Sequence, residues 1–199
     1  MRFARAQHRG YERLLSSLGC DVRRVSPAPE QPDAVFIEDT AVVLDELAVL
    51  ARPGAKSRRH EVAAVGAVLA PLRRVVRIEA PATLDGGDVL VIGRAVFVGR
   101  TTRTNDEGIS QLRAALEPAG YAVHCVAVGG CLHLKSAATA LDDETVLLNP
   151  QWVDVSAFSH YHAVEVDPAE PMGANVLRVG PSLVYGASYP RTLERLRAH

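Results

Sequence analysis

The feature that most restricts what this chain can fold into is a repeated order of elements, in which a tight β-hairpin is followed by a helix. The order occurs four times, and alternating apolar residues around short polar or Gly-containing turns mark each hairpin. A small unit of this kind cannot bury its apolar face alone, so it is stable only when packed against copies of itself. The predicted hairpins cover residues 34–51, 89–98, 136–148 and 176–185.

Closing strands are predicted after the first three helices, which makes the unit ββαβ. They cover residues 74–78, 121–126 and 163–166. A leading helix over 3–18, a strand over 22–25 and a trailing helix from 190 form partial units at the two ends. We therefore predict an α/β fold of the propeller type, a ring of about five ββαβ units with the first and last incomplete. It should form one domain over residues 1–199, because no linker divides the chain.

Composition excludes several classes of function. The 199 residues carry a formal net charge of −1, so nothing favours binding to nucleic acid, and no apolar run is long enough to cross a bilayer. No signal-peptide pattern follows Met1, which makes the cytoplasm the expected location. Cys20, Cys125 and Cys131 lack the spacing of a disulfide framework or a zinc ribbon, and we predict no metal and no cofactor.

Two segments at hairpin entrances carry carboxylates. Asp33, Glu38 and Asp39 lie within seven residues at a strand mouth, where strand alternation would place Asp33 and Asp39 on one side and Glu38 on the other. Acids are depleted inside strands, so this segment favours a site for a cation such as a guanidinium. Asp85-Gly86-Gly87-Asp88 indicates a backbone with positive φ or a close approach. The alternative for both segments is a solvated surface turn.

His133 occupies the place in the third unit that the acids occupy in the first two. It lies between Leu132 and Leu134, which we expect to face the core while the imidazole faces the opposite side. A histidine oriented by a carboxylate is the usual general acid or base, although a lone histidine is more often structural. Arg58 and Arg103 open successive helices and could clamp a carboxylate, or else be exposed helix-start residues.

Together these motifs resemble the dimethylarginine dimethylaminohydrolase family of the pentein superfamily, in the same order along essentially the whole chain. That superfamily has a five-bladed α/β-propeller. The matching segments are Phe36-Ile37-Glu38-Asp39, the stretch 80–89 with Leu84-Asp85-Gly86-Gly87-Asp88, Arg103-Thr104-Asn105, Leu132-His133-Leu134-Lys135-Ser136, Ala174-Asn175 and Tyr189-Pro190.

The resemblance implies hydrolysis of N-omega-methylated arginines to citrulline and methylamines through a covalent cysteine intermediate. It implies that His133 protonates the leaving amine and then activates water, and that Asp85 orients His133. It also implies a substrate-binding set around the guanidinium, the α-amino group and the carboxylate. That set is Asp33, Phe36, Glu38, Asp39, Arg58 and Arg103.

The sequence departs from the family pattern at the nucleophile. The family's cysteine follows a strand after the last helix, and none of the three cysteines takes that place; Cys131, two residues before His133, is the alternative. We therefore expect a chain shortened at both ends, which binds a small guanidino molecule without turnover and self-associates through free sheet edges. Open alternatives are an arginine or agmatine deiminase, an amidinotransferase, or a non-catalytic guanidinium-binding remnant.

Overall fold

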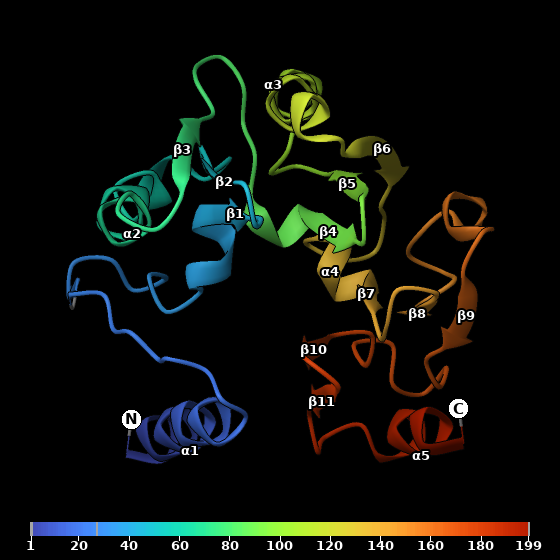
Figure 1. Ribbon diagram of the computed structural model, residues 1–199. Coiled ribbons are helices and arrows are strands. Elements are labelled where there is room, and N and C mark those ends of the chain that lie inside the picture. Colours follow the sequence, from blue (N-terminus) through green and yellow to red (C-terminus); the bar gives the residue numbers. More distant parts are fainter. Residues whose placement is uncertain (1, 27, 199) are drawn as a thin grey trace.

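The computed structural model describes residues 2–26 and 28–198, which form four small sheets set around a common centre (Figure 1). The helices are α1 Arg2–Ser17, α2 Val62–Leu69, α3 Asp106–Leu116, α4 Leu134–Ala137 and α5 Pro190–Ala198. Helices α1, α2, α3 and α5 lie on the outside, and α4 lies near the centre (Figure 1). The strands are β1 Ala41–Val43, β2 Leu47–Leu50, β3 Arg74–Arg77, β4 Val89–Ile92, β5 Ala95–Arg100, β6 Ala122–Ala127, β7 Ala138–Ala140, β8 Thr145–Leu148, β9 His162–Glu165, β10 Val176–Val179 and β11 Ser182–Tyr185.

Three of the sheets have one topology, and it is the predicted ββαβ unit. An antiparallel hairpin is extended by a third strand that runs parallel to its second strand, giving the orders β1-β2-β3, β4-β5-β6 and β7-β8-β9. A parallel neighbour cannot be reached by a tight turn, so a crossover must lie between the two strands. Helix α2, helix α3 and a short 3-10 helix, Val155–Phe158, lie in these crossovers. The fourth sheet is the hairpin β10-β11.

The hairpins follow the sequence prediction closely where a glycine fixes the turn. Gly93 and Gly180 have φ values of 57° and 55°, the left-handed conformation that tight hairpin turns require. The predicted strands 89–92 and 176–179 are confirmed to the residue.

Other predicted elements are wrong. Residues 22–25 form no strand, because no strand among the described residues pairs with them. The predicted strand 34–37 is replaced by turns and a 3-10 helix, Ile37–Thr40. The amide N–H groups of Phe36 and Asp39 donate to carbonyls three residues back, so they are not available to a strand ladder. Residues 136–137 belong to α4 rather than to a strand.

Successive units share their cores, as a repeat of incomplete units requires. One cluster joins Leu47 and Val49 of β2 to Val96 of β5 and Leu112 of α3. A second cluster joins the second unit to the third, and a third joins the third unit to the last hairpin. The loops at the inner strand ends are thereby fixed against one another.

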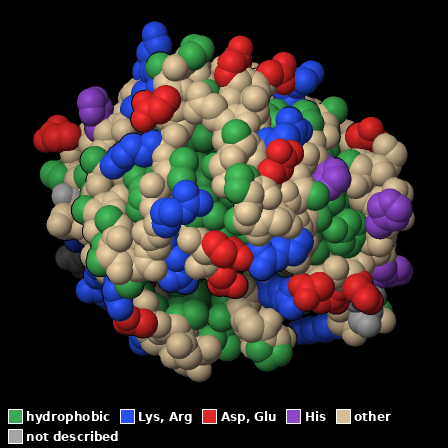
Figure 2. Space-filling view, turned by 45° about the horizontal axis from the view of Figure 1, so that its top comes forward, with side chains coloured by type: hydrophobic (Ala, Val, Ile, Leu, Met, Phe, Trp, Pro, Cys, Tyr) green, Lys and Arg blue, Asp and Glu red, His purple; other side chains and the backbone are tan. Residues whose placement is uncertain are grey.

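The surface agrees with the balanced charge of the sequence. Figure 2 shows Lys and Arg side chains interspersed with Asp and Glu on the face it presents, with hydrophobic side chains between them. Within the described range, no helix is both long and apolar enough to traverse a bilayer.

Candidate active site

Loops from three units meet at a cavity of about 540 Å³, which Tyr11 of α1 and Asn175 before β10 also line. The first unit contributes the segment before β1, the second the Gly-rich turn before β4, and the third the residues at the start of α4. Seven of the eight predicted site residues line this cavity, namely Asp33, Phe36, Glu38, Asp39, Arg58, Arg103 and His133. The eighth, Asp85, is fully buried beside them.

His133 lies at the N-terminal end of α4 in extended conformation, with its imidazole among three carboxylates. Its Nδ1 is 3.3 Å from Asp88 Oδ1 and its Nε2 is 3.8 Å from Asp39 Oδ1. Neither contact has hydrogen-bond geometry, and Nδ1 is buried without a hydrogen-bond partner among the described residues. Burial by itself lowers the pKa of His133, but the adjacent Asp88 carboxylate and the charges of Asp39 and Asp85 outweigh it and raise that pKa.

The expectation that both flanking leucines face the core is wrong. Leu134 is fully buried, whereas Leu132 is 49% exposed and lines the cavity. Alternation fails here because His133 ends an extended segment and the chain then turns into α4.

The Asp85 carboxylate lies close to the His133 imidazole and the Asp39 carboxylate. Its Oδ1 accepts a hydrogen bond of 2.8 Å from the Gly54 amide, and its Oδ2 is buried with no partner within the described chain. Burial raises the pKa of this carboxyl, partly offset by the Gly54 N–H and by His133. The prediction that Asp85 orients His133 stays a prediction, since Asp88 makes the shorter contact.

Asp88 is a site residue that the sequence prediction missed as such. It is fully buried and accepts hydrogen bonds from Thr101 Oγ1, Thr104 Oγ1 and the Leu134 amide. These bonds fix its carboxylate against the helix start that carries His133. The sequence did contain an indication of this role, because Asp88 is the second acid of the Gly-rich motif.

The glycines of that motif are required for a close approach rather than for an unusual φ. Neither has positive φ. A Cβ on Gly86 would collide with the Glu38 carbonyl, and one on Gly87 would lie 2.9 Å from the His133 ring. The first and second units therefore meet through backbone at the floor of the site, where Gly87 N–H donates 3.1 Å to Asp39 Oδ1.

Arg58 does not match the prediction of a free clamp for a substrate carboxylate. Its guanidinium is buried and its nitrogens donate to the Glu61 carboxylate, to Asp39 Oδ2 at 2.6 Å and to the carbonyls of Asp33 and Phe36. Burial opposes the charge, but the hydrogen bonds to Glu61 and Asp39 raise the pKa of Arg58 above its usual value. In this arrangement Arg58 therefore holds the first unit's loop, and Glu61 is a second residue that the sequence prediction missed.

The cavity mouth keeps other charged groups nearer to solvent. Arg103 is half-buried in the lining, and no hydrogen bond from the described residues engages its guanidinium. Lys135 Nζ donates 2.6 Å to Glu38 Oε1, which ties α4 to the first unit. Arg103 thus remains a candidate for binding an anionic ligand group.

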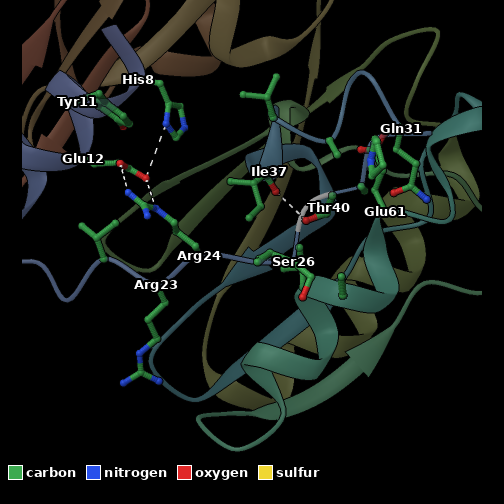
Figure 3. A pocket seen from close by; sticks show the side chains of 18 of the residues that line it. His8, Tyr11, Glu12, Arg23, Arg24, Ser26, Gln31, Ile37, Thr40 and Glu61 are labelled. Atoms are coloured by element: carbon green, nitrogen blue, oxygen red, sulfur yellow. Dashed lines mark hydrogen bonds and ion pairs between the residues drawn. The ribbon is translucent and has the colours of Figure 1, made fainter. Parts of the chain in front are cut away.

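A second cavity, of about 810 Å³, lies between α1 and the segment that leads to α2 (Figure 3). It shares Tyr11, Val35 and Ile37 with the first cavity. Figure 3 shows the Glu12 carboxylate engaged by Arg24 on the α1 side and Glu61 beside Thr40 on the opposite side. Its lining places one imidazole beside one carboxylate, with His8 Nδ1 3.7 Å from Glu12 Oε1. Among the described residues, the converging group of two acids and an imidazole is that of Asp39, Asp85 and His133.

The three thiols do not lie in the lining of either cavity, both drawn from the described residues. Cys131 Sγ donates 3.3 Å to the His133 carbonyl, and burial raises the pKa of its thiol. A nucleophilic cysteine instead needs a lowered pKa. This geometry does not support Cys131 as the nucleophile.

The arrangement suits a small cation that must be bound and whose leaving amine must receive a proton. Within the described chain, Asp39, Asp85 and His133 form the one group whose carboxylate oxygens and imidazole nitrogens lie within 4.8 Å of one another and could share a cation. A planar guanidinium can donate to more than one carboxylate at once. A histidine with a raised pKa, held beside it, can deliver a proton to a departing amine.

Comparison with known proteins agrees with this chemistry. A family model described as arginine deiminase matches residues 5–185. An N(G),N(G)-dimethylarginine dimethylaminohydrolase of Streptomyces coelicolor is 46% identical over 189 residues, which cover 94% of this chain and 72% of the relative. A protein of the same name from Pseudomonas aeruginosa is 33% identical over 96% of this chain and 76% of its own length.

Solved structures show the same relationship. The Pseudomonas aeruginosa enzyme, as a cysteine-to-serine variant complexed with citrulline, gives a TM-score of 0.89 at 31% identity over 97% of this chain and 76% of that one. A histidine-to-glycine dimethylarginine dimethylaminohydrolase, as an adduct with S-methyl-L-thiocitrulline, gives 0.92 at 32% identity over 97% and 77%. An amidinotransferase from Microseira wollei shares the fold, with a TM-score of 0.85 at 19% identity. The chain therefore belongs to the dimethylarginine dimethylaminohydrolase family.

Proposed function

We propose that this protein recognises N-omega-methylated arginines in the central cavity, for hydrolysis to citrulline and a methylamine. The observation that carries the proposal is the convergence of Asp39, Asp85 and His133 within 4.8 Å, with Asp85 Oδ2 buried and unpartnered in the described chain. An unsatisfied buried carboxylate oxygen is costly, and a guanidinium N–H would satisfy it. Two solved relatives support the same ligand class, since one is complexed with citrulline and the other is an adduct with S-methyl-L-thiocitrulline.

We propose the following roles. Asp39 and Asp85 accept hydrogen bonds from the substrate guanidinium, and His133 protonates the amine that leaves and then takes a proton from the attacking water. Arg103 binds the substrate carboxylate, because its guanidinium is the one in the lining that is not already occupied by protein acceptors. Asp33, Phe36 and Glu38 form the outer wall, where Phe36 is 59% exposed and can cover the ligand.

We infer a ring of five ββαβ units as the complete architecture of this site. Three units and a hairpin already surround one centre, and each of the first three delivers polar groups to it (Figure 1). In the family mechanism a cysteine attacks the guanidinium carbon, and the thiols of Cys20, Cys125 and Cys131 do not line this cavity. We therefore expect the 199 residues to bind substrate without releasing citrulline.

Isothermal titration calorimetry with N(G),N(G)-dimethyl-L-arginine tests the proposal. We expect saturable binding at one site, weakened about tenfold or more by Asp39→Asn because one charge-assisted hydrogen bond is lost. Asp143→Asn is the matched control, since that carboxylate also pairs with an arginine, Arg178, but lies outside the cavity. Equal loss in both variants, or no binding to the wild-type chain, would overturn the proposal.

A citrulline assay on the same samples tests the nucleophile. We expect no detectable release from the wild-type chain. Release that disappears in Cys131→Ser would instead identify Cys131 as the attacking thiol.

A further inference from the structure

Behind Asp39, which faces the ligand, lie two buried charged side chains that the proposed reaction does not use, Arg58 and Glu61. Together the three residues form a row of charged groups. It runs from Glu61 through Arg58 to Asp39, and their side chains are 3%, 8% and 11% exposed. Asp39 then contacts the Gly87 amide and lies 3.8 Å from His133 Nε2. The row therefore ends beside the imidazole that the proposed mechanism uses for proton transfer.

Among the described residues, Arg58 alone donates hydrogen bonds to the Glu61 side chain. Its two carboxylate oxygens accept from Arg58 Nε, at 3.2 and 3.0 Å, and from Nη2 at 2.7 Å. Two parallel contacts of this kind fix both the position and the plane of a guanidinium. The remaining nitrogen, Nη1, is thereby directed at Asp39 Oδ2, 2.6 Å away.

Glu61 also determines the charge of the row. With Glu61 ionised, one guanidinium is shared by two carboxylates, so the row carries a net negative charge toward the cavity. Without it, Arg58 and Asp39 would form a neutral pair, and the cavity would attract a cation less. The effect is strong because the groups are buried and poorly screened by water.

From this geometry we propose that Glu61 is a positioning residue of the guanidinium site, which acts through Arg58 to orient Asp39 and to keep the site negative. The inference rests on the proposed function, because it assumes that the cavity takes a cationic guanidino group. Figure 3 shows Glu61 on the wall of the second cavity, so it is placed to act without touching a ligand in the first.

The test compares a cationic ligand with its neutral counterpart of similar shape. L-arginine carries a guanidinium, whereas L-citrulline carries a neutral ureido group. In Glu61→Gln, which keeps the size and removes the charge, we expect the ratio of arginine affinity to citrulline affinity to fall about tenfold, because the lost charge is buried. Calorimetry on the full chain measures both affinities.

The variant Glu61→Asp tests whether a partial loss of the contacts to Arg58 gives a smaller effect. It keeps the charge, but with one methylene less it can reach fewer of the guanidinium nitrogens, so we expect a smaller fall in the ratio, about threefold. If Glu61→Gln does not fold, this variant decides alone. Glu46→Gln is the matched control, since Glu46 is likewise held by an arginine, Arg94 at 2.6 Å, away from the cavity.

NMR titration of the His133 imidazole gives a second readout that a merely structural residue would not move. The charged groups around it are Asp88 and Asp85 from the second unit, with Asp39 and Arg58 from the first. We expect its pKa to fall in Glu61→Gln and to stay unchanged in Glu46→Gln.

The outcomes separate the two proposals. If the wild-type chain binds neither ligand, the proposed function fails. If the wild type binds both, and Glu61→Gln leaves the affinity ratio and the His133 pKa unchanged or weakens both ligands equally, the positioning role of Glu61 is overturned while the proposed function stands.

Discussion

A single imidazole among several carboxylates gives this site its chemical character at the scale of the residue. His133 lies near Asp39 and Asp88, and the charges of those acids and Asp85 raise its pKa. The raised pKa favours the imidazolium, whose charge these acids stabilise. A ligand guanidinium must therefore compete with a proton, which makes binding depend on pH.

The sign of that dependence follows from the direction of the shift. A raised pKa keeps His133 protonated above its ordinary value of about 6.5. As the pH rises above this ordinary value and through the folded-state pKa the imidazolium is lost, so L-arginine should bind more tightly. Loss of a proton from Asp85, whose pKa is also raised, acts in the same direction. Neutral L-citrulline should change far less.

Calorimetry across this pH range measures the slope, with His133→Gln as the comparison. That variant should keep only the part of the slope that Asp85 contributes. An equal slope in wild type and variant would mean that His133 does not titrate against the ligand.

At the scale of the element, helix α3 carries the second unit's contribution to the site through its cap. Asn105 Oδ1 accepts from the Gly108 amide at 2.9 Å and from the Thr83 amide at 2.8 Å. The first bond starts the helix, and the second holds the segment that leads into Asp85. We expect Asn105→Ala to lower the free energy of unfolding by about 1–2 kcal/mol, because a cap and a further hydrogen bond are lost.

Urea unfolding of both proteins checks this expectation. Asn175→Ala, an exposed asparagine outside any helix, is the control and should change stability by less than about 0.5 kcal/mol. A loss for Asn105→Ala no larger than for this control would show that the cap does not stabilise the unit.

Elements also differ in how far local sequence predicts them. The hairpins at Gly93 and Gly180 were predictable because the turn residue fixes the turn and alternation fixes the strands. The segment 33–40 was not, because its conformation depends on Arg58, whose guanidinium binds the carbonyls of Asp33 and Phe36. A contact across more than twenty residues leaves no local pattern.

The same distinction holds for the site. The chemistry-bearing residues were identifiable by type and by their place in each unit, and seven of the eight line one cavity. Sequence could not show that Arg58 is occupied by Glu61 and Asp39, because that depends on how its side chain folds back over the loop. Nor could it distinguish Asp85 from Asp88 as the nearer neighbour of His133.

At the scale of the whole molecule, the site exists only where units meet. Asp39 belongs to the first unit, Asp85 and Asp88 to the second, and His133 to the third. Gly86 allows the first two units to touch backbone to backbone, and Gly87 leaves room for the Asp39 and His133 side chains. Leu134 anchors the third unit in the shared core. Packing between units is therefore what aligns the acids with the imidazole.

The central claim is that this junction binds the guanidino group of a substituted arginine. A crystal structure of the complete chain with N(G),N(G)-dimethyl-L-arginine tests it most directly. We predict that the guanidino group lies among Asp39, Asp85 and His133 and that the ligand carboxylate lies at Arg103. A ligand found instead in the cavity beside α1, or lying in the central cavity with its guanidino group turned away from these acids, would contradict it.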